Sequence, residues 1–198
     1  MPRRVAVALL TPPRWAPPGV DRTAWRVALA DDLLDVFATM IEVEPALALP
    51  VGDDLPIGWP GLRRYELASL DVVSVFAAVA ADGFEQAALV AGDVPDLPGM
   101  LIAKLLRPLT SKTLAAAPAQ GTEPGLLGLS AVLPAPNWLP AEELDTLTPQ
   151  ALRRRAPAIT DVAPAPGWHR LRGPEDLARL DPRLEGWDAT RALLSGRR

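Results

Sequence analysis

Two aspartates in a short turn, Asp93 and Asp96, have the residue types and spacing best suited to chemistry in this sequence. They belong to residues 92–98, GDVPDLP, which directly follow the apolar run 87–91. The two prolines fix φ at their positions and stiffen the turn. A carboxylate held rigidly at a strand end is a ligand for Mg²⁺ or Mn²⁺, which bridge to nucleotide phosphates. The turn therefore predicts a metal–nucleotide site; the alternative is a plain turn in which Asp96 caps the next helix.

The apolar pattern of the chain predicts the elements that would position this turn. Runs of strand length occupy residues 5–10, 46–49, 87–91, 114–117 and 126–132. Helical spacing is found at residues 23–40, 69–81 with Ser69 as the N-cap, 101–109, 149–155 and 174–180. Such alternation is typical of an α/β fold: a three-layer, mostly parallel sheet with helices on both faces. Ligands bind such sheets at the carboxyl ends of the strands, which is where Asp93 lies.

The composition fits a single folded domain, 1–198, and excludes several classes of function. Hydrophobic residues make up 49% of the chain and charged residues 22%, which favours a packed core over disorder. The chain has no cysteine and one histidine, so disulfides, thiolate sites and multi-histidine metal sites are excluded. The net charge of −4 argues against a general nucleic-acid binder.

The sequence also lacks the usual signs of a membrane or secreted protein. No apolar run reaches the ~18 residues of a membrane span. The first residues have neither the length nor the small-residue cleavage site of a signal peptide. We therefore expect a cytoplasmic protein whose partners include neither nucleic acid nor a membrane.

The segment GDVPDLP after an apolar strand resembles the metal-binding turn of a known family. This is the bacterial glycosyltransferase-like family of the nucleotide-diphospho-sugar transferase (GT-A) superfamily, related to the 2-phospho-L-lactate guanylyltransferases and more remotely to the molybdenum-cofactor guanylyltransferases. Residues 32–36, 121–129 and 173–177 are similar to that family's first helix end, glycine-containing loop and C-terminal helix start. The resemblance spans nearly the whole chain and keeps the order of the motifs.

The resemblance implies a Rossmann-like sheet of the GT-A type and transfer of a nucleotidyl or glycosyl group from an activated nucleotide. It implies that Asp93 ligates Mg²⁺ or Mn²⁺ and that Asp96 supports it as the second catalytic carboxylate. The nucleotide would lie along the end of the first strand. The residues expected to bind it are Leu10, Thr11, Pro12, Arg22, Arg170 and Arg172.

Arg170 and Arg172 are the main departure from the family's pattern. The guanylyltransferases have alternating aspartates just before the position of Pro174, where this chain has the two arginines. A cationic side chain cannot ligate a cation. Either the second metal contact is lost, or arginine holds phosphate in the metal's place, for which its fork is well suited. Two residues apart on a strand, the pair would share one face.

Two functions remain open at this point. The first is a metal-dependent nucleotidyl- or glycosyltransferase that uses a nucleotide or nucleotide-sugar donor. The second is a catalytically inactive relative that keeps the fold to bind a nucleotide or a protein partner. The family's first loop normally carries a Lys-Thr-Arg-Leu type motif that holds phosphates, whereas here only Arg14 and Arg22 lie nearby.

The single histidine and several tryptophans are weaker candidates. We expect His169 to face solvent; the alternative is a general base or a phosphate donor. Tryptophans in loops or at strand ends can stack on a base or sugar, although burial of apolar surface is their commoner role. These tryptophans are Trp15, Trp59, Trp138 and Trp168.

Overall fold

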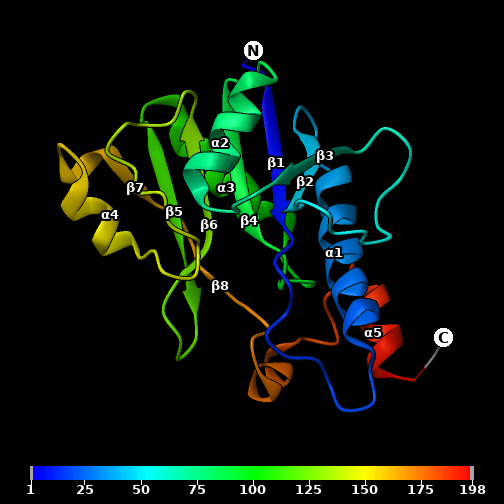
Figure 1. Cartoon of the computed structure of the whole chain (residues 1–198). Helices are drawn as coiled ribbons and strands as arrows, with labels where there is room; N and C mark the ends of the chain where they lie inside the picture. The colour runs from blue at the N-terminus through cyan, green and yellow to red at the C-terminus, as the bar shows by residue number, and fades with distance from the viewer. Residues whose placement is uncertain (1, 197–198) are drawn as a thin grey trace.

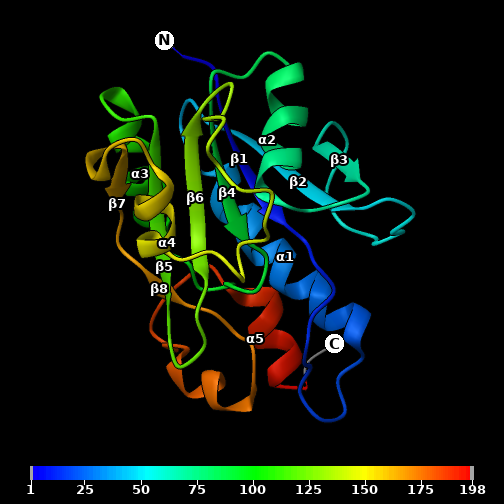
Figure 2. The ribbon, with the colours of Figure 1, turned by 60° about the vertical axis from the view of Figure 1, so that its left-hand side comes forward.

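The computed structural model describes residues 2–196, whose strands form one sheet with helices packed on both faces (Figures 1 and 2). The spatial order is β3-β2-β1-β4-β6-β5-β7, and the short β8 pairs with β5. Pairing is parallel except where β6 lies antiparallel to β4 and to β5. The α/β, mostly parallel fold expected from the sequence is confirmed. The strands are β1 Arg4–Leu9, β2 Glu44–Pro50, β3 Arg63–Leu67, β4 Gln86–Ala91, β5 Leu114–Gln120, β6 Leu126–Val132, β7 Val162–Pro164 and β8 Trp168–His169.

The helices divide between the two faces of the sheet. Helices α2 and α4 pack on one face, and α1 and α3 on the other. Helix α5 packs against α1, away from the sheet. The α-helices are α1 Arg22–Ala38, α2 Val72–Ala81, α3 Gly99–Leu106, α4 Pro149–Arg155 and α5 Asp188–Leu194, and 3₁₀ turns cover Arg107–Thr110, Ile159–Asp161 and Pro174–Arg179.

The central strands β1 and β4 explain why the sheet is buried on both sides. Alternate side chains of a strand point to opposite faces, so a strand covered on both sides must be apolar throughout. In β1, Val5 and Val7 join the core beneath α2, while Ala6 joins the core beneath α1 and α3. In β4 every residue is buried. The continuous apolar runs of the sequence thus mark the middle of the sheet.

Some elements differ from the sequence-based expectation for local physical reasons. Helix α2 begins after Asp71, whose carboxylate accepts a hydrogen bond from Ser74 N at 2.9 Å, so the prediction of Ser69 as N-cap is wrong. Ser69 Oγ instead accepts from Asp71 N at 3.2 Å. Three strands, β3, β7 and β8, were missed, as were α5 and the 3₁₀ turn Ile159–Asp161. The missed strands are short or carry charged residues, so their hydrophobic pattern is weak.

Within residues 2–196, no helix combines the length and the apolar character that a membrane crossing would require.

The C-terminal helix α5 is held by an aspartate of α1. Asp32 is 2% exposed and accepts hydrogen bonds from Ala189 N and Thr190 N at 2.9 and 2.8 Å. Burial raises the pKa of Asp32, and the hydrogen bonds from Thr190 and Ala189 offset part of that rise. Asp32 thus caps a helix that is remote in sequence.

Asp32→Ala is expected to lower the free energy of unfolding by about 0.5–2 kcal/mol, the usual loss when a helix cap is removed. Asp32→Asn keeps one oxygen acceptor and should lose less. Urea unfolding of the three proteins measures both effects. Identical midpoints for Asp32→Ala and the unmodified chain would show that the contact does not stabilise the fold.

Candidate functional site

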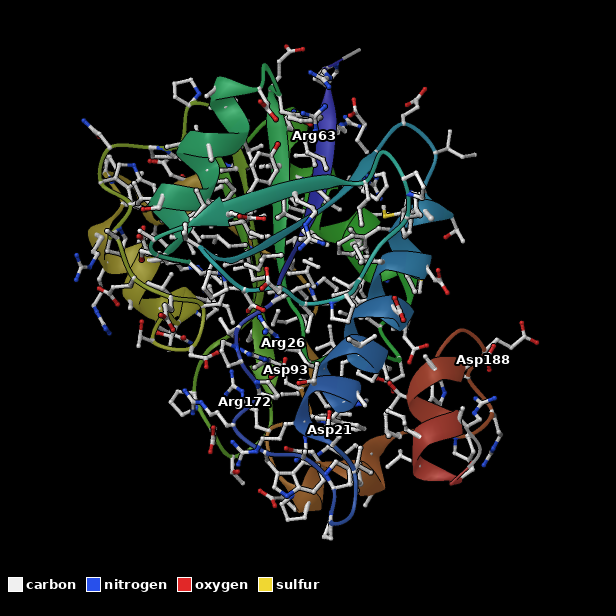
Figure 3. All side chains as sticks on the ribbon, turned by 45° about the vertical axis from the view of Figure 1, so that its right-hand side comes forward. Asp21, Arg26, Arg63, Asp93, Arg172 and Asp188 are labelled. Atoms are coloured by element: carbon white, nitrogen blue, oxygen red, sulfur yellow. The ribbon has the colours of Figure 1, made fainter. Side chains whose placement is uncertain are left out.

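A cleft of about 380 Å³ opens where the parallel strands β1 to β4 end. Its walls come from the ends of these strands and the segments that follow them, from α1, from residues 143–145 and from residues 170–172. This is the edge at which open α/β sheets bind ligands. Figure 3 shows Asp93, Arg26 and Arg172 gathered below the strand ends.

The turn after β4 is held against both β1 and the C-terminal segment. Gly92 N donates to Leu9 O at 3.0 Å. A Cβ atom on Gly92 would lie 2.7 Å from that same oxygen, so only glycine fits this close approach. Leu171 N donates to Asp93 O at 2.9 Å. This hydrogen bond places Arg170 and Arg172, on either side of Leu171 in the sequence, beside the turn.

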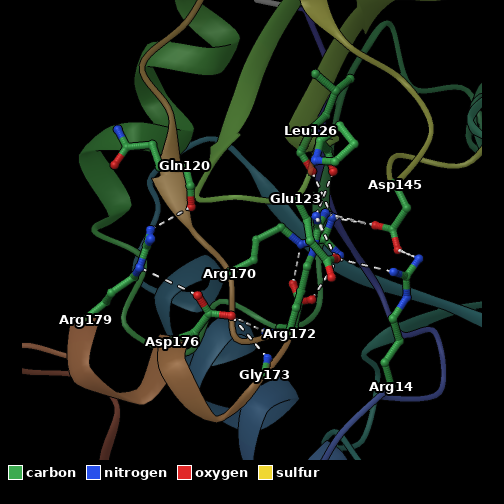
Figure 4. A network of polar contacts seen from close by, with 12 residues as sticks. Arg14, Gln120, Glu123, Leu126, Asp145, Arg170, Arg172, Gly173, Asp176 and Arg179 are labelled. Atoms are coloured by element: carbon green, nitrogen blue, oxygen red, sulfur yellow. Dashed lines mark hydrogen bonds and ion pairs between the residues drawn. The ribbon is translucent and has the colours of Figure 1, made fainter.

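Arg170 is the centre of the charged network in the cleft (Figure 4). Its Nε and Nη2 donate to Asp93 Oδ1 and Oδ2 at 2.6 and 3.0 Å, a two-pronged pair. Its Nη1 donates to Asp145 Oδ1 at 2.5 Å and to Leu126 O at 3.1 Å. The residue is 6% exposed. All three guanidinium nitrogens are bonded, so this side chain is held in place.

Asp145 joins three arginines into one cluster. Its Oδ1 accepts from Arg172 Nη2 at 3.2 Å as well as from Arg170, and its Oδ2 accepts from Arg14 Nη2 at 2.9 Å. Burial alone would raise the pKa of Asp145, but the charges of Arg170, Arg172 and Arg14 outweigh it and lower the pKa below its ordinary value. Asp145 is therefore ionised across the physiological pH range.

The two arginines of the C-terminal segment differ in how well their charge is compensated. Burial would lower the pKa of Arg170, but Asp93 and Asp145 raise it above its usual value. Burial and the neighbouring charge of Arg170 lower the pKa of Arg172, and nearby carboxylates compensate only in part. The charge of Arg172 is therefore less fully compensated than that of Arg170, and an additional anion nearby would stabilise it.

The structure brings most of the sequence-predicted residues into this cleft. Arg22 lies at an adjoining recess together with Pro12 and Arg26. Asp96 is not in the cleft: its buried carboxylate accepts from Trp168 Nε1 at 3.1 Å and lies 3.0 Å from His169 Nε2. The predicted residues that line the cleft are Leu10, Thr11, Pro12, Asp93, Arg170 and Arg172.

The expectation that His169 faces solvent is wrong. The residue is 7% exposed, because β8 pairs with β5 and the ring packs between Asp96 and Trp168. The ring is thereby placed away from the cleft, among structural contacts.

Sequence reasoning missed Arg26, Asp145 and Glu143, which also line the cleft. Arg26 pairs with Asp53 at 2.5 Å and donates to the carbonyl of Leu10. A signal for Arg26 was present, since it stands on a helix between the buried Trp25 and Leu29, where a charged side chain needs a partner. Asp145 gave no such signal because it lies in an irregular segment.

The residues around Asp93 do not fit a bound Mg²⁺ or Mn²⁺. Both oxygens of Asp93 accept hydrogen bonds from Arg170, and both oxygens of Asp145 are paired with arginine. A divalent cation at either carboxylate would lie beside a buried guanidinium and be repelled by it. Within residues 2–196, no group of three or more acidic or histidine side chains is arranged to hold a metal.

Comparison with known proteins identifies the fold. No family model matches the chain, and no curated protein matches it. A protein designated a nucleotide-diphospho-sugar transferase, from Desulfovibrio desulfuricans G20, is similar in structure with a TM-score of 0.64 at 17% identity, over 98% of this chain and 96% of its own. The chain therefore has the α/β fold of the nucleotide-diphospho-sugar transferases.

Two further solved structures share this fold at lower identity. The 4-diphosphocytidyl-2C-methyl-D-erythritol synthase of Anaerococcus prevotii DSM 20548 gives a TM-score of 0.57 at 13% identity, over 97% of this chain and 96% of its own. The second is the glucosyl-3-phosphoglycerate synthase of Mycobacterium tuberculosis, crystallised with Mn²⁺, UDP and glucosyl-3-phosphoglycerate. Its TM-score is 0.55 at 12% sequence identity, over 99% of this chain and 81% of its own. At these identities the likeness concerns the fold alone.

Proposed function

We propose that this chain is a nucleotidyl- or glycosyltransferase-like protein whose cleft binds a nucleotide or nucleotide sugar. The observation that carries the proposal is the gathering of arginines in the cleft at the carboxyl ends of the strands. The charged lining of the cleft consists of four arginines and three carboxylates, and arginine forks suit the oxygens of a diphosphate. These residues are Arg14, Arg26, Arg170, Arg172, Asp93, Glu143 and Asp145. Two enzymes of similar structure, one crystallised with UDP and one named for a diphosphocytidyl product, support the same ligand class.

In this proposal the protein acts by positioning and by charge. Arginine forks orient the diphosphate between the end of β1 and residues 170–172, and they neutralise negative charge that develops on the leaving phosphate. The family resemblance implied that Asp93 ligates a divalent metal ion. With these side chains, the carboxylate of Asp93 instead holds Arg170 in place. Asp96 contributes to the packing of β8.

The proposal is tested by a thermal-shift panel of nucleoside diphosphates, nucleoside triphosphates and nucleotide sugars, with the free nucleosides as controls. A true ligand at ~100 times its dissociation constant should stabilise the protein by about 2.7 kcal/mol. We expect phosphate-bearing compounds to raise the melting temperature and the nucleosides to do so weakly. A panel without any response would contradict the proposal.

A ligand found in this panel also separates the enzyme from a catalytically inactive relative. Incubation of the bound donor with candidate acceptors should release pyrophosphate or a nucleoside diphosphate if group transfer occurs. Binding without release for every acceptor would favour the inactive relative.

A further inference from the structure

We infer that Arg170 serves in this cleft as a built-in cation in place of a divalent metal, so that Arg172 and Arg14 bind a diphosphate without a metal ion. This inference rests on the proposed function of the cleft and adds to it how the phosphates are held. Three features of the site support it. Arg170 is fixed between two carboxylates, other guanidinium groups lie close to it, and the charge of Arg172 is only partly compensated.

The bridge made by Arg170 resembles the role of a metal between two carboxylates. The guanidinium of Arg170 contacts both oxygens of Asp93 and one oxygen of Asp145. These two aspartates are 52 positions apart in the sequence. It also donates to Leu126 O at 3.1 Å. A cation that is bonded on every nitrogen and buried does not exchange with solvent ions. The cleft therefore keeps this guanidinium whether or not metal is supplied.

The guanidinium groups around this bridge oppose a second cation and can contact an anion. Arg172 donates to the same carboxylate oxygen as Arg170: its Nη2 is 3.2 Å from Asp145 Oδ1. A divalent cation at Asp93 would meet these guanidinium groups at close range in a partly buried site, where repulsion is poorly screened. A diphosphate approaching the same point would be attracted by them.

Arg172 and Arg14 have the capacity to contact such a diphosphate. The side chain of Arg172 lines the cleft and is 8% exposed. Its Nη1 donates to Pro124 O at 2.7 Å and its Nη2 to Asp145 Oδ1 at 3.2 Å, whereas its buried Nε has no hydrogen-bond partner within residues 2–196, so a phosphate would have to take over one of the Nη contacts. The lowered pKa of Arg172 agrees with a cation that lacks a full counter-charge. Arg14 is 61% exposed, so its contacts with Asp145 and Glu123 can be exchanged for phosphate at little loss.

The inference is tested by calorimetric titration of the unmodified protein with inorganic pyrophosphate and with UDP, in excess EDTA and then in excess Mg²⁺ or Mn²⁺. We expect binding in EDTA that is at least as tight as in metal, because Mg²⁺ and Mn²⁺ complex the diphosphate and reduce its negative charge. Binding that appears only with metal would overturn the inference and leave the proposed function standing. Absence of binding in both conditions would overturn the proposed function together with the inference.

Variants identify the arginines in the same assay. Arg172→Ala, and Arg172→Gln as a second version that keeps polar contacts, should each weaken binding at least about tenfold, as expected for a lost charge-assisted hydrogen bond. Arg183→Ala is the matched control, because that side chain is 92% exposed and lies outside the cleft. Unchanged affinity in both Arg172 variants, with melting temperatures like that of the unmodified chain, would remove Arg172 from the site.

Discussion

Replacing Arg170 with alanine is expected to lower the free energy of unfolding by about 3 kcal/mol, the lower end of the 3–5 kcal/mol typical of breaking a buried ion pair. The reason is that the change leaves the carboxylate of Asp93 without its partner and takes one of three arginines from Asp145. The lower end applies because these two side chains are 21% and 22% exposed, so water replaces part of the lost contact. Denaturant unfolding, with the slope checked for constancy, measures the change.

Two companion variants show whether the loss comes from the bridge. Arg170→Lys keeps the charge but has one nitrogen, which cannot contact both carboxylates in the same way, so we expect an intermediate loss. Arg183→Ala removes an arginine whose side chain is 92% exposed and should change stability by no more than about 0.5 kcal/mol. If Arg170→Ala were as stable as Arg183→Ala, the bridge would not contribute to the fold.

Trp25→Ala is expected to be the most destabilising change among the aromatic residues of α1, at about 3–5 kcal/mol. Trp25 is 0% exposed and packs with Leu29 and Leu171, and its ring meets that of Trp15 edge-on at 6.0 Å. Its removal leaves a large cavity between α1, the loop after β1 and the C-terminal segment. Leu171 lies between Arg170 and Arg172 in the sequence, so the cavity should also make the positions of these two side chains less well defined.

The matched control for this change is Trp59→Ala, the same substitution at a residue that is 40% exposed in the loop between β2 and β3. We expect it to lose much less stability, because a partly exposed ring leaves a smaller cavity. Thermal or urea unfolding of both variants gives the comparison. Similar losses in the two proteins would mean that Trp25 does not hold these segments together.

The middle of the fold could be predicted from the sequence because it depends on local pattern. The apolar runs at residues 5–10 and 87–91 became β1 and β4, and the helical spacing at residues 23–40 became α1. A strand buried on both faces needs an unbroken apolar run, and such a run is legible without knowledge of its neighbours. The same reasoning placed Asp93 at the carboxyl edge of the sheet, and Asp93 does line the cleft there.

Only the tertiary structure decided what surrounds Asp93. Its partner Arg170 lies 77 residues away in the sequence, and Asp145 belongs to an irregular segment with no periodic pattern. The burial of His169 likewise depends on β8 joining β5, a pairing of two residues that is too short to predict. Periodicity shows which face of an element is buried, whereas the partners of a charged side chain depend on how distant segments meet. The sequence by itself determined the middle of the sheet and the position of Asp93 at its edge. The contacts between distant segments decided that the guanidinium of Arg170 lies against Asp93.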